Sequence, residues 1–476
     1  MVFSSLEFLF IFLPTMIICY YLLAPLKNGK FSLLFLFIGS IFFYAYWNLQ
    51  NTWILIASIL VNYIFGIWIH NTNKFRKHIF IFALMCNIGV LMYFKYTNFF
   101  INTLNVTCST QIQTLNIILP LGISFFIFQK IAYLSDIYMY RHDPSNNGLL
   151  NFGLFASFFP QLIAGPIVHH KEIMPQFASN SSPAVNWENI YCGFVMLSIG
   201  LAKKIILADN LAQIVRYSFD EVGSLTFTEA TLASITYSLQ LYFDFSGYSD
   251  MAIGCALFFN IILPQNFCTP YKSLNIQDFW RRWHITLSRW LRNYLYIPLG
   301  GNRSGPIRTL CNLFITFLLG GFWHGAAWTY LLWGAMHGIA LAMHRLWLRA
   351  CSKPVPTTLA WLMTFVFVNF AWIVFRVPNF GRLGKFCDAF LGYNGFMFRA
   401  NFKEHLLNTL GLPSFTMIHI FVCASFALAV LGRNSSELLS CKDRSLVTLI
   451  VPILFAASIL QIIMESTIPE FIYFQF

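Results

Sequence analysis

Long apolar runs recur along almost the whole of this 476-residue chain. A transmembrane helix needs about 20 mostly apolar residues. Runs of nearly that length occupy residues 6–23, 31–47, 53–69, 79–94, 117–137, 190–207, 309–322, 328–347, 359–375, 415–431 and 446–464. Charged residues make up only 10% of the chain, against roughly a quarter in soluble domains. The sequence therefore predicts an all-α protein that crosses a membrane many times.

Two further apolar segments do not suit a plain crossing helix. Segment 231–263 is too long for one straight crossing and carries polar residues near its middle, so it predicts a long tilted helix, a broken helix or two shorter ones (Asp244, Asp250). Segment 151–168 contains Pro160 and Pro166 and is predicted to be re-entrant. Because non-helical backbone at membrane depth needs protein or water to cover it, we expect irregular elements packed inside a helical body.

Lysine and arginine in short loops predict the orientation of a membrane protein. Basic residues follow the first and third runs, at 27–30 and 74–77, whereas loop 48–52 has no charge. Together with basic residues at 433–444, this pattern predicts both termini outside the cytoplasm. Five basic residues between 376 and 403 would then face outward, so the rule leaves the central topology open. The first run has no basic segment before it and no cleavage site after it, so we expect it to be retained.

No internal repeat or linker stands out, and we predict one membrane domain over residues 1–476. The eleven cysteines are scattered singly, without a Cys-x-x-Cys pair. This spacing disfavours a disulfide framework and a zinc site. We expect no metal and no bound cofactor.

His324 lies in the sequence Gly-Gly-Phe-Trp-His-Gly (320–325), inside one of the most apolar parts of the chain. An ionisable ring at membrane depth has to face protein or a water-filled path. The flanking glycines permit close approach of backbone or substrate, and Trp323 and Trp328 are predicted to enclose the ring. These features favour a reactive site over a packed core histidine. His337 and His344, in contrast, are predicted to be packing or interfacial residues.

A second histidine, His284, lies among arginines and tryptophans in Trp-Arg-Arg-Trp-His-Ile-Thr-Leu-Ser-Arg-Trp (280–290). Two histidines in contrasting environments can separate acid and base roles. Arg281, Arg289 and Arg292 are spaced to share one face of a continuous helix. Such a face suits anionic lipid headgroups, and arginine forks also match a phosphate-bearing donor. Both interpretations stay open, with Arg282 as a further candidate.

These two histidine motifs closely resemble the signature of the membrane-bound O-acyltransferases. Tyr-Phe-Asp-Phe-Ser-Gly-Tyr-Ser-Asp (242–250) and Gln-Leu-Ile-Ala-Gly-Pro-Ile (161–167) also resemble the bacterial branch that contains alginate and peptidoglycan O-acetyltransferases. The resemblance covers the chain from its first residues to its end, with the histidine-motif core at about 231–347. It implies a ring of roughly 11–13 transmembrane or re-entrant helices around a thin centre that a tunnel crosses.

The resemblance also implies roles. His324 corresponds to the family's catalytic histidine and His284 to its second, more variable histidine. The implied donor is cytoplasmic acetyl-CoA, and the acceptor is a cell-envelope polysaccharide outside the bacterial cytoplasmic membrane. The chain has no Gly-x-Ser-x-Gly elbow, so the serine-esterase-type partner of this branch would be a separate extracytoplasmic protein.

Two alternatives remain at this stage. One is a D-alanyl transferase of teichoic acid, which uses an aminoacyl carrier protein; the other is a transporter, although we find no internal symmetry to support it. The aromatic ending Phe-Ile-Tyr-Phe-Gln-Phe (471–476) resembles a C-terminal motif of the D-alanyl branch. It is either an interfacial anchor or a relay in which Tyr473 carries the acyl group to the partner.

Overall fold

The computed structural model describes residues 1–141, 148–179, 184–303, 305–351, 353–439, 444–464 and residue 471. These ranges contain helices and no strand. Seven of the described helices are long and apolar enough to cross a membrane, or eight if the bent pair 400–410 and 415–431 forms one span. The predicted class, an all-α multi-pass membrane protein, is confirmed.

The helices agree with most of the predicted spans. The seven helices, some of them continued by π-helical turns, are Lys30–Trp47, Leu49–Asn71, Arg76–Cys108, Trp187–Glu221, Pro306–His324, Thr357–Arg376 and Val447–Met464. The predicted runs at 6–23, 117–137 and 328–347 correspond instead to the helical stretch Phe8–Leu22 and to α6 (Ile123–Tyr140) and α16 (Trp328–Ala350). The first of these helices is shorter than a full crossing, and α6 and α16 are long enough to cross a membrane but less apolar than the seven.

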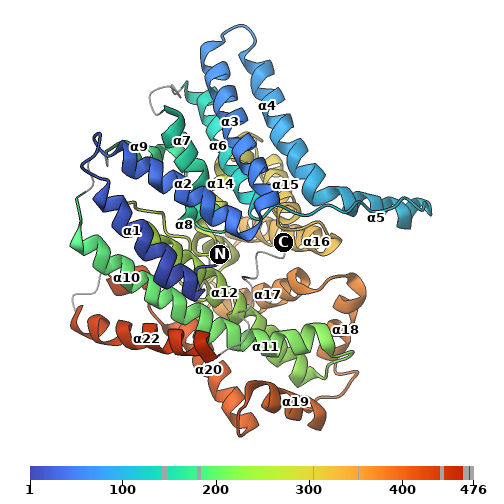
Figure 1. The fold of residues 1–476 in the computed structure, drawn as a ribbon. Helices are drawn as coiled ribbons and strands as arrows, with labels where there is room; N and C mark the ends of the chain where they lie inside the picture. The colour runs from blue at the N-terminus through green and yellow to red at the C-terminus, as the bar shows by residue number, and fades with distance from the viewer. Residues whose placement is uncertain are drawn as a thin grey trace. The chain divides into compact units, whose positions relative to one another are not determined.

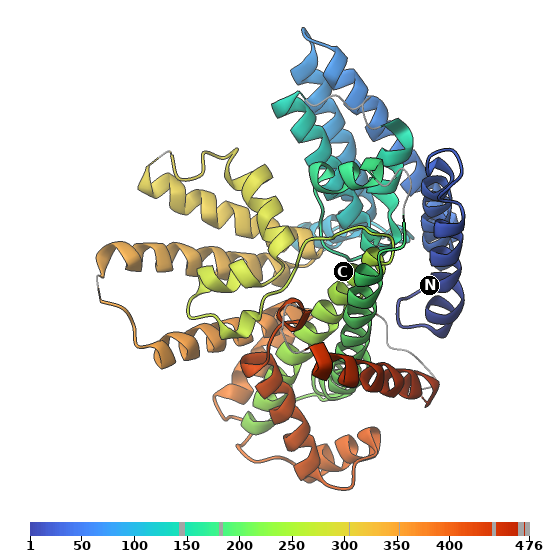
Figure 2. The same cartoon turned by 90° about the vertical axis from the view of Figure 1, so that its left-hand side faces the viewer.

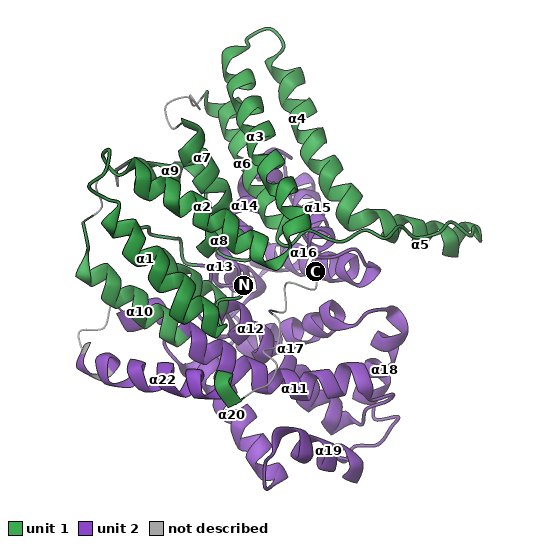
Figure 3. Cartoon of the chain, in the orientation of Figure 1, with its two compact units in different colours: residues 1–199, 248–265, 462–468 green, residues 200–247, 266–461, 469–476 purple. Residues whose placement is uncertain are grey.

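The chain divides into two compact units, coloured separately in Figure 3. Unit 1 comprises residues 1–199, 248–265 and 462–468, and unit 2 comprises residues 200–247, 266–461 and 469–476. Neither unit is a continuous segment, because the chain passes from one to the other several times. No single cut in the sequence therefore separates the two units.

Unit 1 is built from helices that pack both on sequence neighbours and on helices further along the chain. Its elements are η1 (Phe8–Phe12), α1 (Leu13–Leu22), α2 (Lys30–Trp47), α3 (Leu49–Asn71), α4 (Arg76–Leu91), η2 (Met92–Tyr96), α5 (Thr97–Cys108), α6, α7 (Gly148–Ser157), α8 (Phe159–Leu162), α9 (His170–Ser179) and most of α10 (Trp187–Leu201). Helices α3, α4 and α6 lie side by side (Figure 1). Asn62 of α3 and Asn87 of α4 exchange hydrogen bonds of 3.2 and 2.7 Å between their amides, which satisfies both groups in an apolar interior.

The segment predicted to be re-entrant is irregular and buried. Helix α7 ends at Ser157, one turn follows as α8, and extended chain then leads to α9. Every described residue from Phe152 to Val168 is buried. The hydroxyl of Ser157 donates to the carbonyl of Gly153, and the amide of Gln161 donates to the carbonyl of Phe155. These bonds give partners to backbone carbonyl groups that lipid could not hydrogen-bond.

Unit 2 contains both histidine motifs. Its elements are η4 (Ala202–Asp209), α11 (Asn210–Arg216), η5 (Tyr217–Glu221), most of α12 (Phe227–Leu257), η6 (Pro270–Lys272), α13 (Ile276–Arg282), α14 (Ile285–Leu291), η7 (Arg292–Tyr296), α15 (Pro306–His324), α16, α17 (Thr357–Arg376), α18 (Phe380–Phe390), α19 (Ala400–Leu410), α20 (Phe415–Leu431), α21 (Ser435–Leu439) and most of α22 (Arg444–Met464). Helices α15 and α16, and α16 and α17, pack side by side (Figure 2).

Helix α12 is one continuous helix of 31 residues, so the single long helix among the three predicted forms is the correct one. Its start is fixed by a capping box. The backbone N–H of Thr226 donates to Oε2 of Glu229 at 3.0 Å, and the N–H of Glu229 donates to Oγ1 of Thr226 at 3.4 Å. Glu229 also binds Arg399, which ties the start of α12 to the start of α19.

Candidate functional site

Helices α15 and α16 approach closely because glycines line their contact. A Cβ atom on Gly334 of α16 would collide with the carbonyl oxygen of Phe317, and a Cβ on Gly338 would lie 2.9 Å from Cα of Phe314. On α15, a Cβ at Gly321 would collide with the carbonyl oxygen of Tyr330. Small residues are what allow helices to approach so closely in membranes. The predicted close approach of backbone is therefore confirmed at Gly321, whereas the atoms nearest to Gly320 and Gly325 belong to side chains.

His324 is the last residue of α15, and its side chain is buried among rings. Its ring centroid lies 4.9 Å from Trp323, 5.1 Å from Trp333 and 5.3 Å from Phe375, in edge-on arrangements. Trp328, which was also expected to enclose this ring, is 52% exposed. Trp333, one helical turn further along α16, lies against the histidine ring. His324 thus stands at a helix end within an aromatic cage.

His284 occupies a break between two short helices. Helix α13 ends at Arg282 and α14 begins at Ile285, and His284 between them has a left-handed backbone with φ of 42°. The side chain is fully buried. Its ring lies edge-on to Phe245 at 4.8 Å, and its Nδ1 lies 3.0 Å from Oδ1 of Asn266. Burial lowers the pKa of His284 to about 3, so the ring is neutral at physiological pH.

A cluster of aromatic rings connects the surroundings of the two histidines. Trp333 stacks on Trp372 with centroids 5.8 Å apart, and Trp372 lies 4.8 Å from Trp283, the residue before His284. At the other end, Trp333 contacts His324. The structure therefore places both histidines at the border of one aromatic cluster in unit 2, a proximity that their spacing of forty residues could not establish.

His337 is a buried member of the same cluster. Its Nδ1 accepts a hydrogen bond of 3.2 Å from the indole N–H of Trp280, and its ring centroid lies 4.7 Å from Trp333. Because an indole N–H can only donate, Nδ1 of His337 must be the acceptor. The prediction that His337 is a packing residue agrees with this position. The hydrogen bond to Trp280 had no signal in the sequence, because the two residues are 57 positions apart.

Arg281, Arg289 and Arg292, which were predicted to share one face, do not lie on one continuous helix. The break at 283–284 separates Arg281 and Arg282, on α13, from Arg289 on α14 and Arg292 at the start of η7. The prediction of a single face was wrong because it assumed a continuous helix. Arg282 forms an ion pair of 3.0 Å with Asp278 on its own helix, whereas Arg281 and Arg292 are exposed.

A buried ion cluster that was not predicted lies in unit 2. The ammonium of Lys204 is 2.7 Å from Asp209 and 2.8 Å from Asp244. Lys204 and Asp209 belong to the π-helical turn η4, where residues five apart lie on one side of the helix. Asp244 precedes Phe245, the ring that contacts His284. The cluster therefore ties η4 to α12 at the position where α12 contacts His284.

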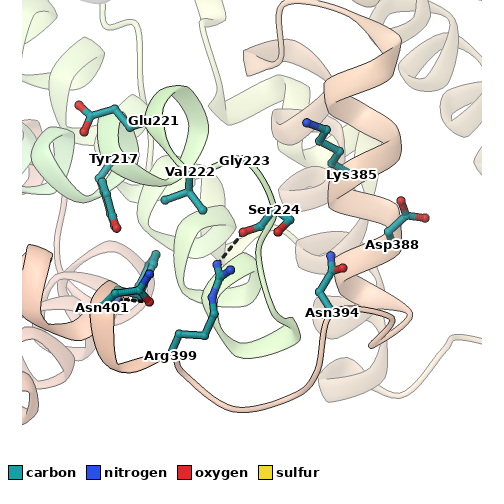
Figure 4. A pocket seen from close by; sticks show the side chains of 11 residues that line it. Tyr217, Glu221, Val222, Gly223, Ser224, Lys385, Asp388, Asn394, Arg399 and Asn401 are labelled. Carbon is teal, nitrogen blue, oxygen red and sulfur yellow. Dashed lines mark hydrogen bonds between the residues drawn. The ribbon is translucent and has the colours of Figure 1, made fainter.

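A polar pocket of about 510 Å³ lies elsewhere in unit 2 (Figure 4). It is bordered by the residues that follow α11 and by α18 and the start of α19, and it is lined by Tyr217, Glu221, Val222, Gly223, Ser224, Lys385, Asp388, Asn394, Arg399, Asn401 and Phe402. Arg399 donates to the carbonyl of Ser224 at 2.6 Å. Neither histidine lines this pocket, so it is a feature separate from the histidine site.

Tyr473 lies outside the described residues. Phe471, two positions earlier, is described; it is buried, and its ring centroid lies 5.8 Å from Phe245. The possible role of Tyr473 as an acyl carrier therefore stays a prediction from the sequence.

Comparison with known proteins gives a family match over most of the chain. Residues 10–384 match the family described as MBOAT, membrane-bound O-acyltransferase family. A peptidoglycan O-acetyltransferase of Helicobacter pylori is 43% identical, with all of this chain and 98% of that protein covered. A probable alginate O-acetylase of Pseudomonas putida is 35% identical over the full length of both. A teichoic acid D-alanyltransferase of Bacillus subtilis is 28% identical over 56% of this chain and 70% of its own length.

Proposed function

The chain belongs to the membrane-bound O-acyltransferase family, and from this membership we propose that it transfers acetyl groups for O-acetylation of a cell-envelope polysaccharide. The protein is a multi-pass membrane acyltransferase. The acceptor class we propose, peptidoglycan or an alginate-like polymer, follows from the two relatives that are similar over their full length. The D-alanyl alternative has weaker support, since that relative is similar over only part of the chain.

The observation that carries the proposal is the position of His324 at the end of a glycine-packed helix, inside an aromatic cage. In the proposed reaction, His324 accepts the proton of an acceptor hydroxyl. The oxygen then attacks the thioester carbonyl carbon, the carbon–sulfur bond breaks, and the thiolate leaves and recovers the proton. A positioned general base of this kind contributes roughly 10²–10⁴-fold to the rate. His284 is proposed as the second histidine of the site.

The proposed donor is cytoplasmic acetyl-CoA. Arg281 and Arg292 are exposed and available to its phosphates, and Arg289 is half-buried on the helix after His284. Arg282 is the least suitable of the four candidates, because its guanidinium already binds Asp278 and lies 3.5 Å from the carbonyl of Cys268. Charge reversal at Arg281 would then raise KM for acetyl-CoA more than it lowers kcat, since a remote phosphate contact stabilises ground state and transition state equally.

The proposal extends to the cell. The protein would lie in the bacterial cytoplasmic membrane with both termini outside, where a serine-esterase-type partner would receive the acetyl group. Tyr473 is the proposed carrier, because an aryl ester is a more activated acyl donor than an alkyl ester. The variant Tyr473→Phe keeps the ring and removes the only oxygen that can be acylated. Wild-type polysaccharide acetylation in cells carrying this variant would exclude the carrier role.

The activity is tested with purified protein and radiolabelled acetyl-CoA. We expect His324→Ala to abolish thioester consumption while its thermal stability stays near wild type, and His284→Ala to reduce it. His344→Ala is the matched control, because His344 lies on α16 but outside the aromatic cluster. Turnover at the wild-type rate in His324→Ala would refute the proposed base. Consumption of a D-alanyl carrier-protein thioester in place of acetyl-CoA would favour the alternative donor.

A further inference from the structure

Asn266 binds the segment that contains His284 through both its backbone and its side chain. Its carbonyl oxygen accepts a hydrogen bond of 2.9 Å from the backbone N–H of Ile285. Two residues away, the N–H of Cys268 donates to the carbonyl of Arg282 at 2.9 Å. The extended chain around Asn266 is therefore paired with the break between α13 and α14, on both sides of His284.

Three donors converge on the side-chain oxygen of Asn266. Thr286 contributes its backbone N–H at 3.3 Å and its hydroxyl at 2.9 Å, and Nδ1 of His284 lies 3.0 Å away. Asn266 is 1% exposed and His284 is fully buried, so water does not compete for these positions. The arrangement is a built acceptor site, not a chance contact of two surface groups.

The backbone N–H of Thr286 decides which atoms carry protons. An amide N–H can only donate, so the Asn266 atom that faces it must be the oxygen. An oxygen at that position can only accept from Nδ1 of His284, and Nδ1 must therefore carry the proton. In a neutral imidazole the other nitrogen then holds the lone pair.

We propose that Asn266 is a positioning residue that holds His284 as the Nδ1–H tautomer and so makes Nε2 its basic nitrogen. The low pKa of the buried ring is consistent with this, because a neutral ring has one acceptor nitrogen and a protonated ring has none. The catalytic consequence rests on the proposed function of His284, but the tautomer itself does not.

The conformation of His284 makes this positioning necessary. A residue at φ of 42° cannot rely on a regular helix to orient its side chain, and the edge-on contact with Phe245 does not distinguish one ring nitrogen from the other. The hydrogen bond to Asn266 is the contact among those described above that selects a tautomer. Oriented imidazoles at reactive sites are commonly fixed through a hydrogen bond to their second nitrogen.

The tautomer can be measured directly in protein labelled with ¹⁵N-histidine and reconstituted in lipid. The His284 signal is assigned by its loss in a His284 variant. We expect a protonated Nδ1 and an unprotonated Nε2 in the wild type at pH 7. An unprotonated Nδ1 would overturn the proposal, whatever the activity of the protein.

Two substitutions test the role of Asn266. Asn266→Leu removes the acceptor, and we expect the proton to leave Nδ1 and thioester consumption to fall by up to the factor that is lost in His284→Ala. Asn266→Asp keeps the shape and the acceptor oxygen, but its charge favours the imidazolium. It should move the acid limb of the kcat/KM profile up by roughly one to three pH units. Should the leucine variant fail to fold, the wild-type tautomer and the aspartate variant still decide the question.

A control separates positioning from mere stability. Asn87→Leu removes another buried amide, the one paired with Asn62 in unit 1, and should lower thermal stability without moving the acid limb. An acid limb unchanged in Asn266→Asp, or moved equally in Asn87→Leu, would refute the positioning role. A correct tautomer together with full activity in His284→Ala would leave the assignment of Asn266 standing and refute the catalytic role of His284.

Discussion

The two histidines of the site differ in what could be known about each from the sequence. The glycines beside His324 indicated close helix packing, and the structure confirms it at Gly321. His284 gave no such local sign, since its hydrogen-bonding partner Asn266 precedes it by 18 positions on another segment. Neighbours within one helical turn leave a pattern in the sequence. A side chain supplied by a distant segment leaves none, and only the folded chain shows it.

The ion pair of Glu229 and Arg399 gives a pH prediction at the scale of single residues. Burial raises the pKa of Glu229, but hydrogen bonds from the side chain and backbone of Arg399 and from Thr226 outweigh it, and the net pKa lies below its usual range. A carboxyl with a lowered folded pKa stabilises the fold above its unfolded pKa of about 4.3. This contribution is lost as pH falls from there through the folded value.

The prediction is measured as thermal unfolding in detergent at several pH values. Glu229→Gln should lower the free energy of unfolding at pH 7 by roughly 2 kcal/mol, the usual range for hydrogen bonds to charged groups. The difference from wild type should shrink as pH falls below about 4, because the carboxyl of the unfolded chain is protonated first and that of the folded protein follows at its lower pKa. A difference that stays constant down to pH 3 would contradict the assigned cause.

At the scale of elements, the break between α13 and α14 is the feature that the sequence pattern did not predict. The arginine spacing suggested one face across 281–292, but the chain leaves the helix at Trp283 and His284. No proline or glycine marks this break. It is stabilised by the backbone hydrogen bonds to Asn266 and Cys268, which compensate for the helical bonds given up. Periodicity cannot detect a break whose cause is tertiary.

The contact between α15 and α16 gives a prediction for one glycine. In Gly334→Ala, the new methyl group would meet the backbone of Phe317, which cannot move as a side chain could. We expect the helices to separate, with a cost of roughly 1–3 kcal/mol from overpacking, partly offset by about 1 kcal/mol of helix propensity. Acetyl-CoA consumption should fall as well, because His324 and Trp333 lie on these two helices.

The matched control is Gly384→Ala on α18, where a Cβ would meet no atom within 4 Å. This variant should keep or slightly raise the melting temperature and leave turnover unchanged. If Gly334→Ala melts and reacts like Gly384→Ala, the close approach of α15 and α16 is not required for the site.

For the whole molecule, composition was sufficient to predict the class, and apolar runs located most helices. The number of crossings was less predictable, because α6 and α16 combine membrane-length helices with polar side chains that face the protein interior. Lys130 of α6 and His337 of α16 are fully buried examples. Such residues lower the mean hydropathy of a helix, but a low mean hydropathy does not show whether the other faces of the helix contact lipid. The division into two discontinuous units also has no counterpart in the sequence.

Orientation is the prediction that belongs to this scale. In a background without native cysteines, Gln50→Cys, in the first turn of α3, should react with a membrane-impermeant maleimide added to intact cells. Lys74→Cys, between α3 and α4, should react only after permeabilisation. Both positions are exposed, so access to the reagent is limited by the membrane alone. The opposite pattern would place the N-terminus in the cytoplasm.

The left-handed backbone of His284 makes glycine, not alanine, the residue that empties this position without strain. An L-residue there costs roughly 1–2 kcal/mol that glycine does not, so His284→Gly removes the imidazole and relaxes the chain at once. What remains is a ring-sized space beside Phe245, with the oxygen of Asn266 still held by Thr286. Free imidazole has the shape and the N–H donor for that space. Chemical rescue of the glycine variant by imidazole would then restore the lost group without its covalent link to the chain.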